Sequence, residues 1–317
     1  MKKTYIGIDI GGTKCAVVLG DGEGNILEKM KFPTTDVTET IENILAGADQ
    51  MKEKSAGTAV SVGISCGGPL DPKRGIVQSP PNLPGWDNIA IVNRVRERIG
   101  LPAVLCNDAN ACALAEYTFG AGRGSENMIF LTFGTGLGAG IILDGQLYNG
   151  TNGNAGEVGH MRLERFGPVG YGKQGSFEGF CSGGGIAMSA KTAAVERLQQ
   201  GKTTAYCKSF AELDAVTAKS VAEAAYAGDE TAIDVYETCG AMLGRGLSIL
   251  VDVLNPERIV IGSIFQRSAD LLIPSMQRVM REECLAPSYA VVQVVPAELG
   301  DNLGDLAALS LAISIDK

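Results

Sequence analysis

Two copies of one short pattern constrain the fold of this 317-residue chain more than any other feature. In each copy, an apolar run enters a tip of glycine and threonine, and a second apolar run follows. The first copy spans residues 6–14 (I-G-I-D-I-G-G-T-K) and the second spans 129–140 (I-F-L-T-F-G-T-G-L-G-A-G). Short apolar runs on both sides of a glycine tip are typical of a β-hairpin. Because the copies lie about 120 residues apart, they predict a duplicated module.

The tips have the chemistry of a phosphate site. Glycine lets the backbone adopt positive φ and come close to a ligand. Successive backbone N–H groups, together with the Thr135 hydroxyl, suit an anion such as a phosphate. Taken alone, residues 134–136 are more readily explained as an ordinary tight turn. The copy at 11–13 favours one phosphate-facing hairpin in each half of the chain.

Predicted strands and helices alternate in both halves. This alternation predicts an α/β fold of two domains with a ligand cleft between them. We expect a smaller domain of residues 1–120 plus 299–317, completed by the last helix, and a larger domain of residues 121–298. The predicted strands are 4–10, 15–20, 26–32, 59–65, 103–106, 258–261 and 291–295, beside the second hairpin. The predicted helices are 38–54, 87–99, 109–119, 189–199, 218–227, 229–254, 266–283 and 303–315, whereas 149–160 and 165–185 are expected to be non-helical.

Composition argues against several classes of partner. A net charge of −9 disfavours nonspecific binding to nucleic acid or to anionic membranes. Glycine accounts for 42 residues, about 13% against a usual ~7%, which favours a backbone that approaches ligands closely. The eight cysteines include no C-x-x-C pair, so we expect reduced thiols and a cytoplasmic protein. No apolar segment reaches the ~18 residues of a membrane span.

Several polar residues stand where predicted strands end, which is where α/β folds bind ligands. Asp108 follows the apolar strand 103–106 and precedes a helix. It is a candidate general base that accepts a hydroxyl proton during phosphoryl transfer, or else a helix N-cap. Asp9, beside the first tip, is a candidate for holding Mg²⁺ directly or through water, or else a turn-forming residue.

A carboxylate and the chain's one imidazole, Glu157 and His160, follow the glycine-rich run 149–156. Glu178 follows them in G-S-F-E. Such acceptors and donors suit a neutral, hydroxylated ligand. The alternative is that they are ordinary polar residues of surface loops.

Taken together, these motifs resemble the ROK family of sugar kinases and repressors, within the actin/hexokinase superfamily. The resemblance is carried by D-I-G-G-T at 9–13, F-G-T-G-L-G at 133–138, E-V-G-H at 157–160 and Asn107-Asp108, and it covers essentially the whole chain. The run P-N-L-P-G-W at 81–86 is also similar to the sugar-side loop of that family. The resemblance implies two actin-like (ribonuclease H-like) domains.

The resemblance also implies roles for individual residues. ATP phosphates and Mg²⁺ would be bound by the two tips, and the adenosine would lie near Gly262. Asp108 would be the catalytic base. The residues implied for ATP are Asp9, Gly11, Gly12, Thr13, Lys14, Gly134, Thr135, Gly136 and Gly262, with Asp9 also holding Mg²⁺. Those implied for the sugar are Gly68, Asn82, Asn107, Asp108, Glu157, His160 and Glu178.

One segment departs from the family pattern. After the histidine, ROK proteins usually carry a zinc motif, C-x-C-G-x-x-G-C-x-E. The three thiol positions are here Val169, Tyr171 and Ser176. A structural zinc site needs about four ligands, and His160 alone is left, so we predict no zinc. We expect packing and hydrogen bonds, for instance through Phe177 and Tyr171, to order this segment instead.

The expected function is that of an ATP-dependent hexose kinase, with the 6-hydroxyl of glucose as the leading acceptor. N-acetylmannosamine, N-acetylglucosamine, fructose and allose remain alternatives. A sugar-responsive repressor would carry an additional N-terminal DNA-binding segment, whereas the first strand here is expected at about Thr4. A sugar-binding protein without catalysis is disfavoured by the intact Asp9 and Asp108. The family also implies a homodimer or homotetramer.

Overall fold

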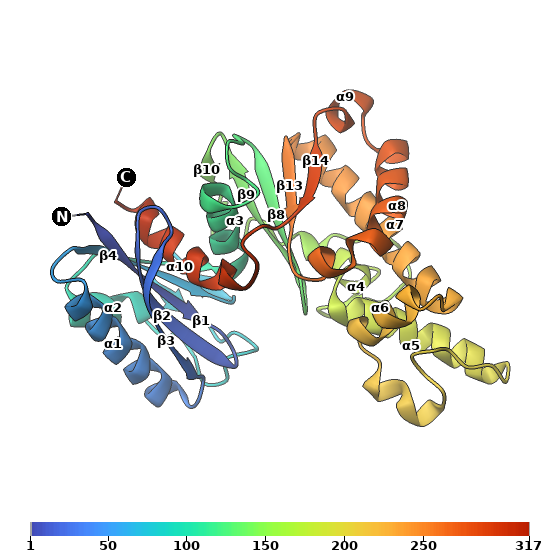
Figure 1. Cartoon of the computed structure of the whole chain (residues 1–317), viewed down its shortest axis with the longest axis horizontal. Helices are drawn as coiled ribbons and strands as arrows, with labels where there is room; N and C mark the ends of the chain where they lie inside the picture. The colour runs from blue at the N-terminus through green and yellow to red at the C-terminus, as the bar shows by residue number, and fades with distance from the viewer. Residues whose placement is uncertain (1, 317) are drawn as a thin grey trace. The chain divides into compact units, whose positions relative to one another are not determined.

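The computed structural model describes residues 2–316 and divides into two compact units. The first unit contains the chain up to Glu126, Gly140–Gly156 and the chain from Glu298 onward, and the second contains Asn127–Ala139 and Glu157–Ala297. Residues 2–316 contain two five-stranded sheets with helices packed against them (Figure 1). The predicted α/β class is therefore confirmed.

The sheet of the first unit has the strand order β3-β2-β1-β4-β7. β1 pairs antiparallel with β2 and parallel with β4, and β4 pairs parallel with β7. The register places Asp9 opposite Ser65, and Ser65 opposite Cys106. The carboxyl ends of three neighbouring strands therefore lie at one edge of the sheet. The bounds are β1 Thr4–Ile10, β2 Lys14–Asp21, β3 Ile26–Pro33, β4 Ala59–Cys66 and β7 Ala103–Asn107, with a small hairpin of β5 Leu70–Asp71 and β6 Ile76–Val77.

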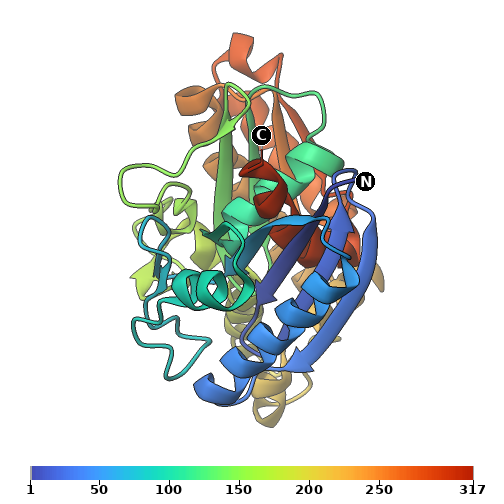
Figure 2. The ribbon, with the colours of Figure 1, turned by 90° about the vertical axis from the view of Figure 1, so that its left-hand side faces the viewer.

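Helices cover both faces of this sheet (Figures 1 and 2). α1 (Val37–Lys54) and α2 (Ile91–Ile99) pack on one face, and α10 (Leu303–Ser314) packs on the other beside α3 (Asp108–Phe119). Glycine makes the contact with α10 possible, because a Cβ at Gly63 would lie 2.1 Å from the carbonyl oxygen of Ala308.

The carboxylate of Glu116, on α3, connects this helix to the backbone that follows it and to the backbone at the start of the last segment of the first unit. Glu116 is fully buried. Its Oε2 accepts from the N–H of Ala121 at 2.8 Å and from that of Glu298 at 3.2 Å. Its Oε1 accepts from the N–H groups of Glu298 and Leu299 at 3.1 and 3.0 Å. Backbone donors thus satisfy both oxygens, as a buried charge requires.

The sheet of the second hairpin repeats the order of the first, as β10-β9-β8-β13-β14. β13 lies parallel to both β8 and β14, and β10 pairs antiparallel with β9. The two sheets match strand for strand, which is the structural form of the predicted duplication. The bounds are β8 Met128–Phe133, β9 Leu137–Leu143, β10 Gln146–Leu147, β13 Arg258–Ile261 and β14 Gln293–Pro296. β9 begins in the second unit and ends in the first.

The helices of the second unit form its main core with β8 and β13. The longest pair, α7 (Glu230–Leu254) and α8 (Ile264–Glu283), pack against each other (Figure 1). The others are α4 Phe177–Phe180, α5 Gly183–Gln199, α6 Ala218–Tyr226 and α9 Ala286–Tyr289, with 3-10 turns at Val158–His160 and Phe210–Ala215 and a small ribbon of β11 Val169–Gly170 and β12 Lys173–Gln174. A further 3-10 turn, Gly300–Asn302, belongs to the first unit.

Three sequence-based expectations were wrong. The helix predicted from residue 87 begins at Ile91, because Ile89 is hydrogen-bonded to Val77 in a bridge. Residues 165–185 were expected to be non-helical, yet they contain α4 and the start of α5, where Ser182 caps the helix by accepting from the N–H of Gly185. The tip glycines have no positive φ. Their role at the tips is close approach, as described below.

Within residues 2–316, no helix is both long enough and apolar enough to cross a membrane.

Candidate active site

Asn107 and Asp108 stand at the junction of β7 and α3. Asn107 is the N-cap, and its Oδ1 accepts from the N–H of Ala109 at 2.9 Å. The capping role considered for Asp108 is therefore filled by its neighbour. The Asp108 side chain is exposed, and its Oδ1 also accepts from the Ala109 N–H at 2.8 Å. Partial desolvation by the surrounding protein raises the pKa of Asp108, against the lowering effect of that backbone donor.

The end of β4 brings two glycines to the same place. A Cβ on Gly68 would lie 3.3 Å from Nδ2 of Asn107, and one on Gly67 would lie 3.8 Å from Oδ2 of Asp108. The structure therefore brings together Gly68, Asn107 and Asp108, which were predicted to contact the sugar.

Asp9 is half-buried near the carboxyl end of β1. Gly304 makes room for it, because a Cβ there would lie 2.8 Å from Oδ2 of Asp9. Burial, reinforced by the buried carboxylate of Asp305, raises the pKa of Asp9 to about 6, and Lys14 acts in the opposite direction. Asp305 itself forms an ion pair with Lys29.

The chemistry of Asp9 suits a magnesium ligand. Among residues 2–316, no group of three or more His, Cys, Asp or Glu side chains could form a metal site. Mg²⁺ characteristically uses one or two carboxylates and completes its shell with phosphates and water. Asp9, in the cradle opened by Gly304, offers one such carboxylate.

The first hairpin tip contacts the loop that contains Asn82. The N–H of Gly11 donates to the carbonyl of Lys14 at 3.1 Å and so closes the tip. A Cβ on Gly12 would lie 2.6 Å from the carbonyl oxygen of Asn82. Asn82 is exposed, while its loop is anchored by the buried Leu83 and Trp86. The tip and a predicted sugar-binding residue are therefore in direct contact.

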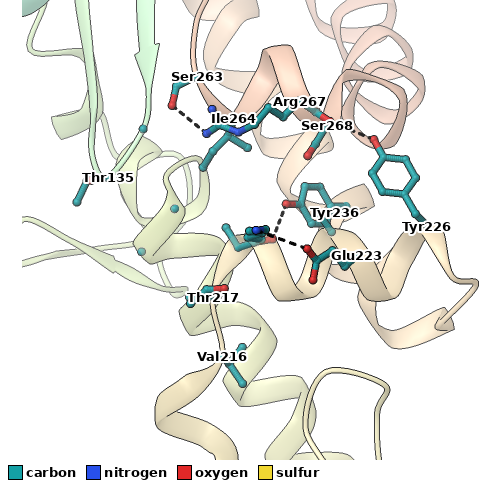
Figure 3. A pocket seen from close by; sticks show the side chains of 17 residues that line it. Thr135, Val216, Thr217, Glu223, Tyr226, Tyr236, Ser263, Ile264, Arg267 and Ser268 are labelled. Carbon is teal, nitrogen blue, oxygen red and sulfur yellow. Dashed lines mark hydrogen bonds and ion pairs between the residues drawn. The ribbon is translucent and has the colours of Figure 1, made fainter. Parts of the chain in front are cut away.

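The second unit contains a cavity of about 680 Å³, which lies within the usual ~300–1,000 Å³ of small-molecule sites. Gly134 and Thr135 of the second tip line it, beside Gly183 and Gly184 at the N-terminus of α5. Helix N-termini and exposed backbone N–H groups favour phosphate. The remaining walls come from α6, α7 and the start of α8 (Figure 3).

The far walls of this cavity combine apolar and polar groups (Figure 3). Val216, Ala222 and Ile264 supply apolar surface. Arg267 donates through Nη2 to Oγ of Ser263 at 3.3 Å. Ser263 has a φ of 57°, an uncommon conformation that clusters at ligand sites.

The sequence predicted part of this cavity. Gly134 and Thr135 line it, whereas Gly136 and Gly262 are next to lining residues, Thr135 and Ser263. Sequence reasoning missed the walls of α6, α7 and α8, since their residues follow the pattern of core helices. The one available signal was the G-S pair that ends strand β13.

Glu157, His160 and Glu178 belong to segments that contact Leu137, where the second hairpin tip leads into β9. Glu157 and His160 are exposed; Glu157 precedes a 3-10 turn and His160 is its last residue. Gly159 between them has room for no side chain, because a Cβ would lie 2.2 Å from the carbonyl oxygen of Leu137 and 3.2 Å from Cβ of Glu178. Glu178, on α4, is half-buried. The three predicted sugar-binding residues of the second unit therefore share one region.

The segment that lacks the zinc thiols is ordered by contacts of several kinds. Phe177 is fully buried, and Ser176 caps α4 by accepting from the N–H of Gly179 at 3.1 Å. The exposed ring of Tyr171 meets the His160 ring edge-on, with centroids 5.2 Å apart. Lys173 donates through Nζ to the carbonyl of His160 at 2.6 Å. Both Phe177 and Tyr171 thus contribute, the first by packing and the second through His160.

Comparison with known proteins identifies relatives of this chain. The profile of the ROK family matches residues 5–315. A glucokinase of Streptomyces coelicolor is 34% identical over 309 residues, which cover 97% of this chain and 96% of that protein. A crystal structure of a ROK family glucokinase from Streptomyces griseus, in complex with glucose and AMPPNP, is 32% identical with a TM-score of 0.76, covering 98% of this chain and 99% of that one.

A xylose repressor of Caldicellulosiruptor bescii is 28% identical over 98% of this chain and 78% of that protein. Both kinases and a regulator are thus among its relatives. The family profile spans nearly the whole chain, and the glucokinase similarity exceeds 30% identity over almost its full length. The chain therefore belongs to the ROK family.

Proposed function

We propose that this chain is an ATP-dependent glucokinase, which transfers the γ-phosphoryl group of ATP to the 6-hydroxyl of glucose. The observation that carries the proposal is similarity to glucokinases over nearly the full length of both chains. The site geometry supports it independently, because each unit supplies a hairpin tip with a predicted sugar-binding residue beside it.

On the donor side, the 134–136 tip holds the phosphates and the cavity of the second unit holds the nucleoside. The cavity supports this assignment with its apolar walls and with Gly183 and Gly184 at a helix N-terminus. We assign phosphate binding also to residues 11–13 of the first unit, with Lys14 beside them. Phosphoryl transfer needs positioning and charge neutralisation more than covalent chemistry.

On the acceptor side, Asp108 takes the proton of the attacking hydroxyl. The oxygen–phosphorus bond to the sugar forms while the bond from the γ-phosphorus to the β–γ bridging oxygen breaks, and ADP leaves. The raised pKa of Asp108 brings it closer to that of an effective general base. Asn107, Asn82 and Gly68 orient the sugar from the first unit, and Glu157, His160 and Glu178 bind hydroxyls from the second.

Asp9 would hold Mg²⁺, directly or through water. When bound, the ion neutralises charge on the β- and γ-phosphates. This chain's contribution is a half-buried carboxylate whose surroundings are fixed by Gly304 and by the buried Asp305.

Other acceptors are alternatives within the same chemistry: N-acetylmannosamine, N-acetylglucosamine, fructose and allose. Allose differs from glucose at one stereocentre and the two N-acetylhexosamines differ from it at C2, and a single group in a pocket discriminates by only ~1–3 kcal/mol. A regulator without kinase activity is disfavoured by Asp108, which is exposed and released from the capping role. We also propose a homodimer or homotetramer in the cytoplasm, to be checked by light scattering and fractionation.

The deciding experiment is a coupled assay of ADP formation with ATP and Mg²⁺ across these five sugars. We expect glucose to give the highest kcat/KM. A higher kcat/KM for another sugar would reassign the acceptor. If no sugar stimulates ADP formation, the kinase function is wrong.

A further inference from the structure

One carboxylate oxygen of Glu178 is already engaged inside the second unit. Its Oε2 accepts a hydrogen bond from the backbone N–H of Leu137 at 3.0 Å. Leu137 is the first residue of β9, so this bond holds the strand that leaves the 134–136 tip. The side chain therefore ties the sugar side of the unit to the phosphate hairpin.

The neighbouring glycine fits this contact. A Cβ on Gly136 would lie 2.7 Å from Oε2 of Glu178. The φ of Gly136 is not positive, so backbone conformation does not demand glycine there. What demands it is the approach of the carboxylate.

The backbone beneath Glu178 is held firmly. The N–H of Phe177 donates to the carbonyl of Met161 at 2.8 Å. The Phe177 ring is fully buried against Gly246, where a Cβ would lie 2.4 Å from the ring. Glu178 therefore projects from a fixed point, and its bond to Leu137 transmits that position to the hairpin.

The first unit shows a close approach of a different kind, in which its tip meets the backbone carbonyl and Cβ of Asn82. Gly12 of its tip also lacks positive φ, and a Cβ there would meet Asn82. In both units, a residue expected at the sugar hydroxyls lies against a glycine of the phosphate tip.

We propose that Glu178 is a positioning residue for the phosphate hairpin, whose Oε2 holds the 134–137 backbone for the nucleotide while Oε1 remains for a sugar hydroxyl. The inference rests on the proposed kinase function and deepens it. Its consequence is that Glu178 contributes to nucleotide binding in the absence of sugar. A residue that only bound sugar would leave nucleotide affinity unchanged.

The test is isothermal titration of the full chain with ADP, without sugar, beside steady-state kinetics. Glu178→Ala removes the acceptor of the Leu137 N–H, and we expect the Kd for ADP to rise about tenfold. Glu178→Gln keeps a carbonyl that can accept that bond, so its Kd for ADP should stay within about threefold of wild type, while its KM for the sugar rises. Gly136→Ala pushes the carboxylate away and should weaken ADP binding as Glu178→Ala does. The exposed Glu237→Ala on α7 is the control.

An unchanged Kd for ADP in Glu178→Ala would overturn the inference and leave the kinase function standing. Equal weakening in Glu178→Gln and Glu178→Ala would also overturn it, because the charge rather than the hydrogen bond would then be responsible. A wild-type chain that binds no ADP would overturn the proposed function itself. Circular dichroism shows whether each variant is folded. If Glu178→Ala is unfolded, Glu178→Gln remains as a variant that preserves the volume of the side chain.

Discussion

Glu116→Gln tests whether the buried carboxylate of α3 stabilises the first unit through its hydrogen bonds to the backbone at Ala121 and at residues 298–299. The substitution keeps the size of the side chain but replaces one acceptor oxygen with a donor. Whichever way the amide turns, Ala121 or Leu299 loses its acceptor, and Glu298 keeps one of its two. A hydrogen bond to a charged group contributes ~1.5–3 kcal/mol, and a buried unsatisfied donor adds to the loss. We expect the free energy of unfolding to fall by about 2–4 kcal/mol.

The chain provides its own probe for this measurement. Its single tryptophan, Trp86, is buried in the core of the first unit, so its fluorescence in urea reports the unfolding of that unit. The midpoint should move to lower urea with an unchanged slope. Glu97→Gln, on an exposed position of α2, should change stability by less than ~0.5 kcal/mol. If Glu116→Gln is as stable as this control, the hydrogen-bonding argument is refuted.

Asp108→Asn should lower kcat at least ~10²-fold while sugar binding, measured by titration, survives; near-normal kcat would rule out the general base. Metal analysis of the purified chain should find no stoichiometric zinc, and one zinc per chain would disprove our account of residues 169–178. Because burial raises the pKa of Asp9 to about 6, the folded state binds its proton more tightly than the unfolded chain does. Stability should therefore fall as pH rises from about 4 through 6. Asp9→Asn should remove that slope and be up to about 3 kcal/mol more stable at pH 7; an unchanged slope in urea titrations would contradict this.

The duplicated hairpins could be predicted because they depend on local sequence. An apolar run, a glycine tip and another apolar run specify a hairpin within about 12 residues. Strand ends carrying Asp9 and Asp108 could be predicted for the same reason. The matching order of the two sheets then followed from the repeat.

The donor cavity and the Glu178 contact could not be predicted. Val216, Ala222 and Ile264 line the cavity, yet in sequence they are indistinguishable from core residues of helices. Glu178 and Leu137 are 41 positions apart, and their bond joins a side chain to a backbone N–H, which leaves no residue pattern. Positive φ at the tips was wrongly expected, because a sequence shows a glycine without showing whether conformation or close approach requires it.

The position of α10 has a consequence for biosynthesis. This helix covers the β1–β4 face of a sheet whose strands were all made within the first 107 residues. During translation that face, with Gly7 and Gly63 shaped to receive the helix, stays uncovered until residues 303–314 emerge from the ribosome. The second unit is complete by residue 297 and can fold earlier. The first unit to be synthesised is therefore the last to finish folding. Until α10 is made, its uncovered apolar face is the surface to which chaperones would bind.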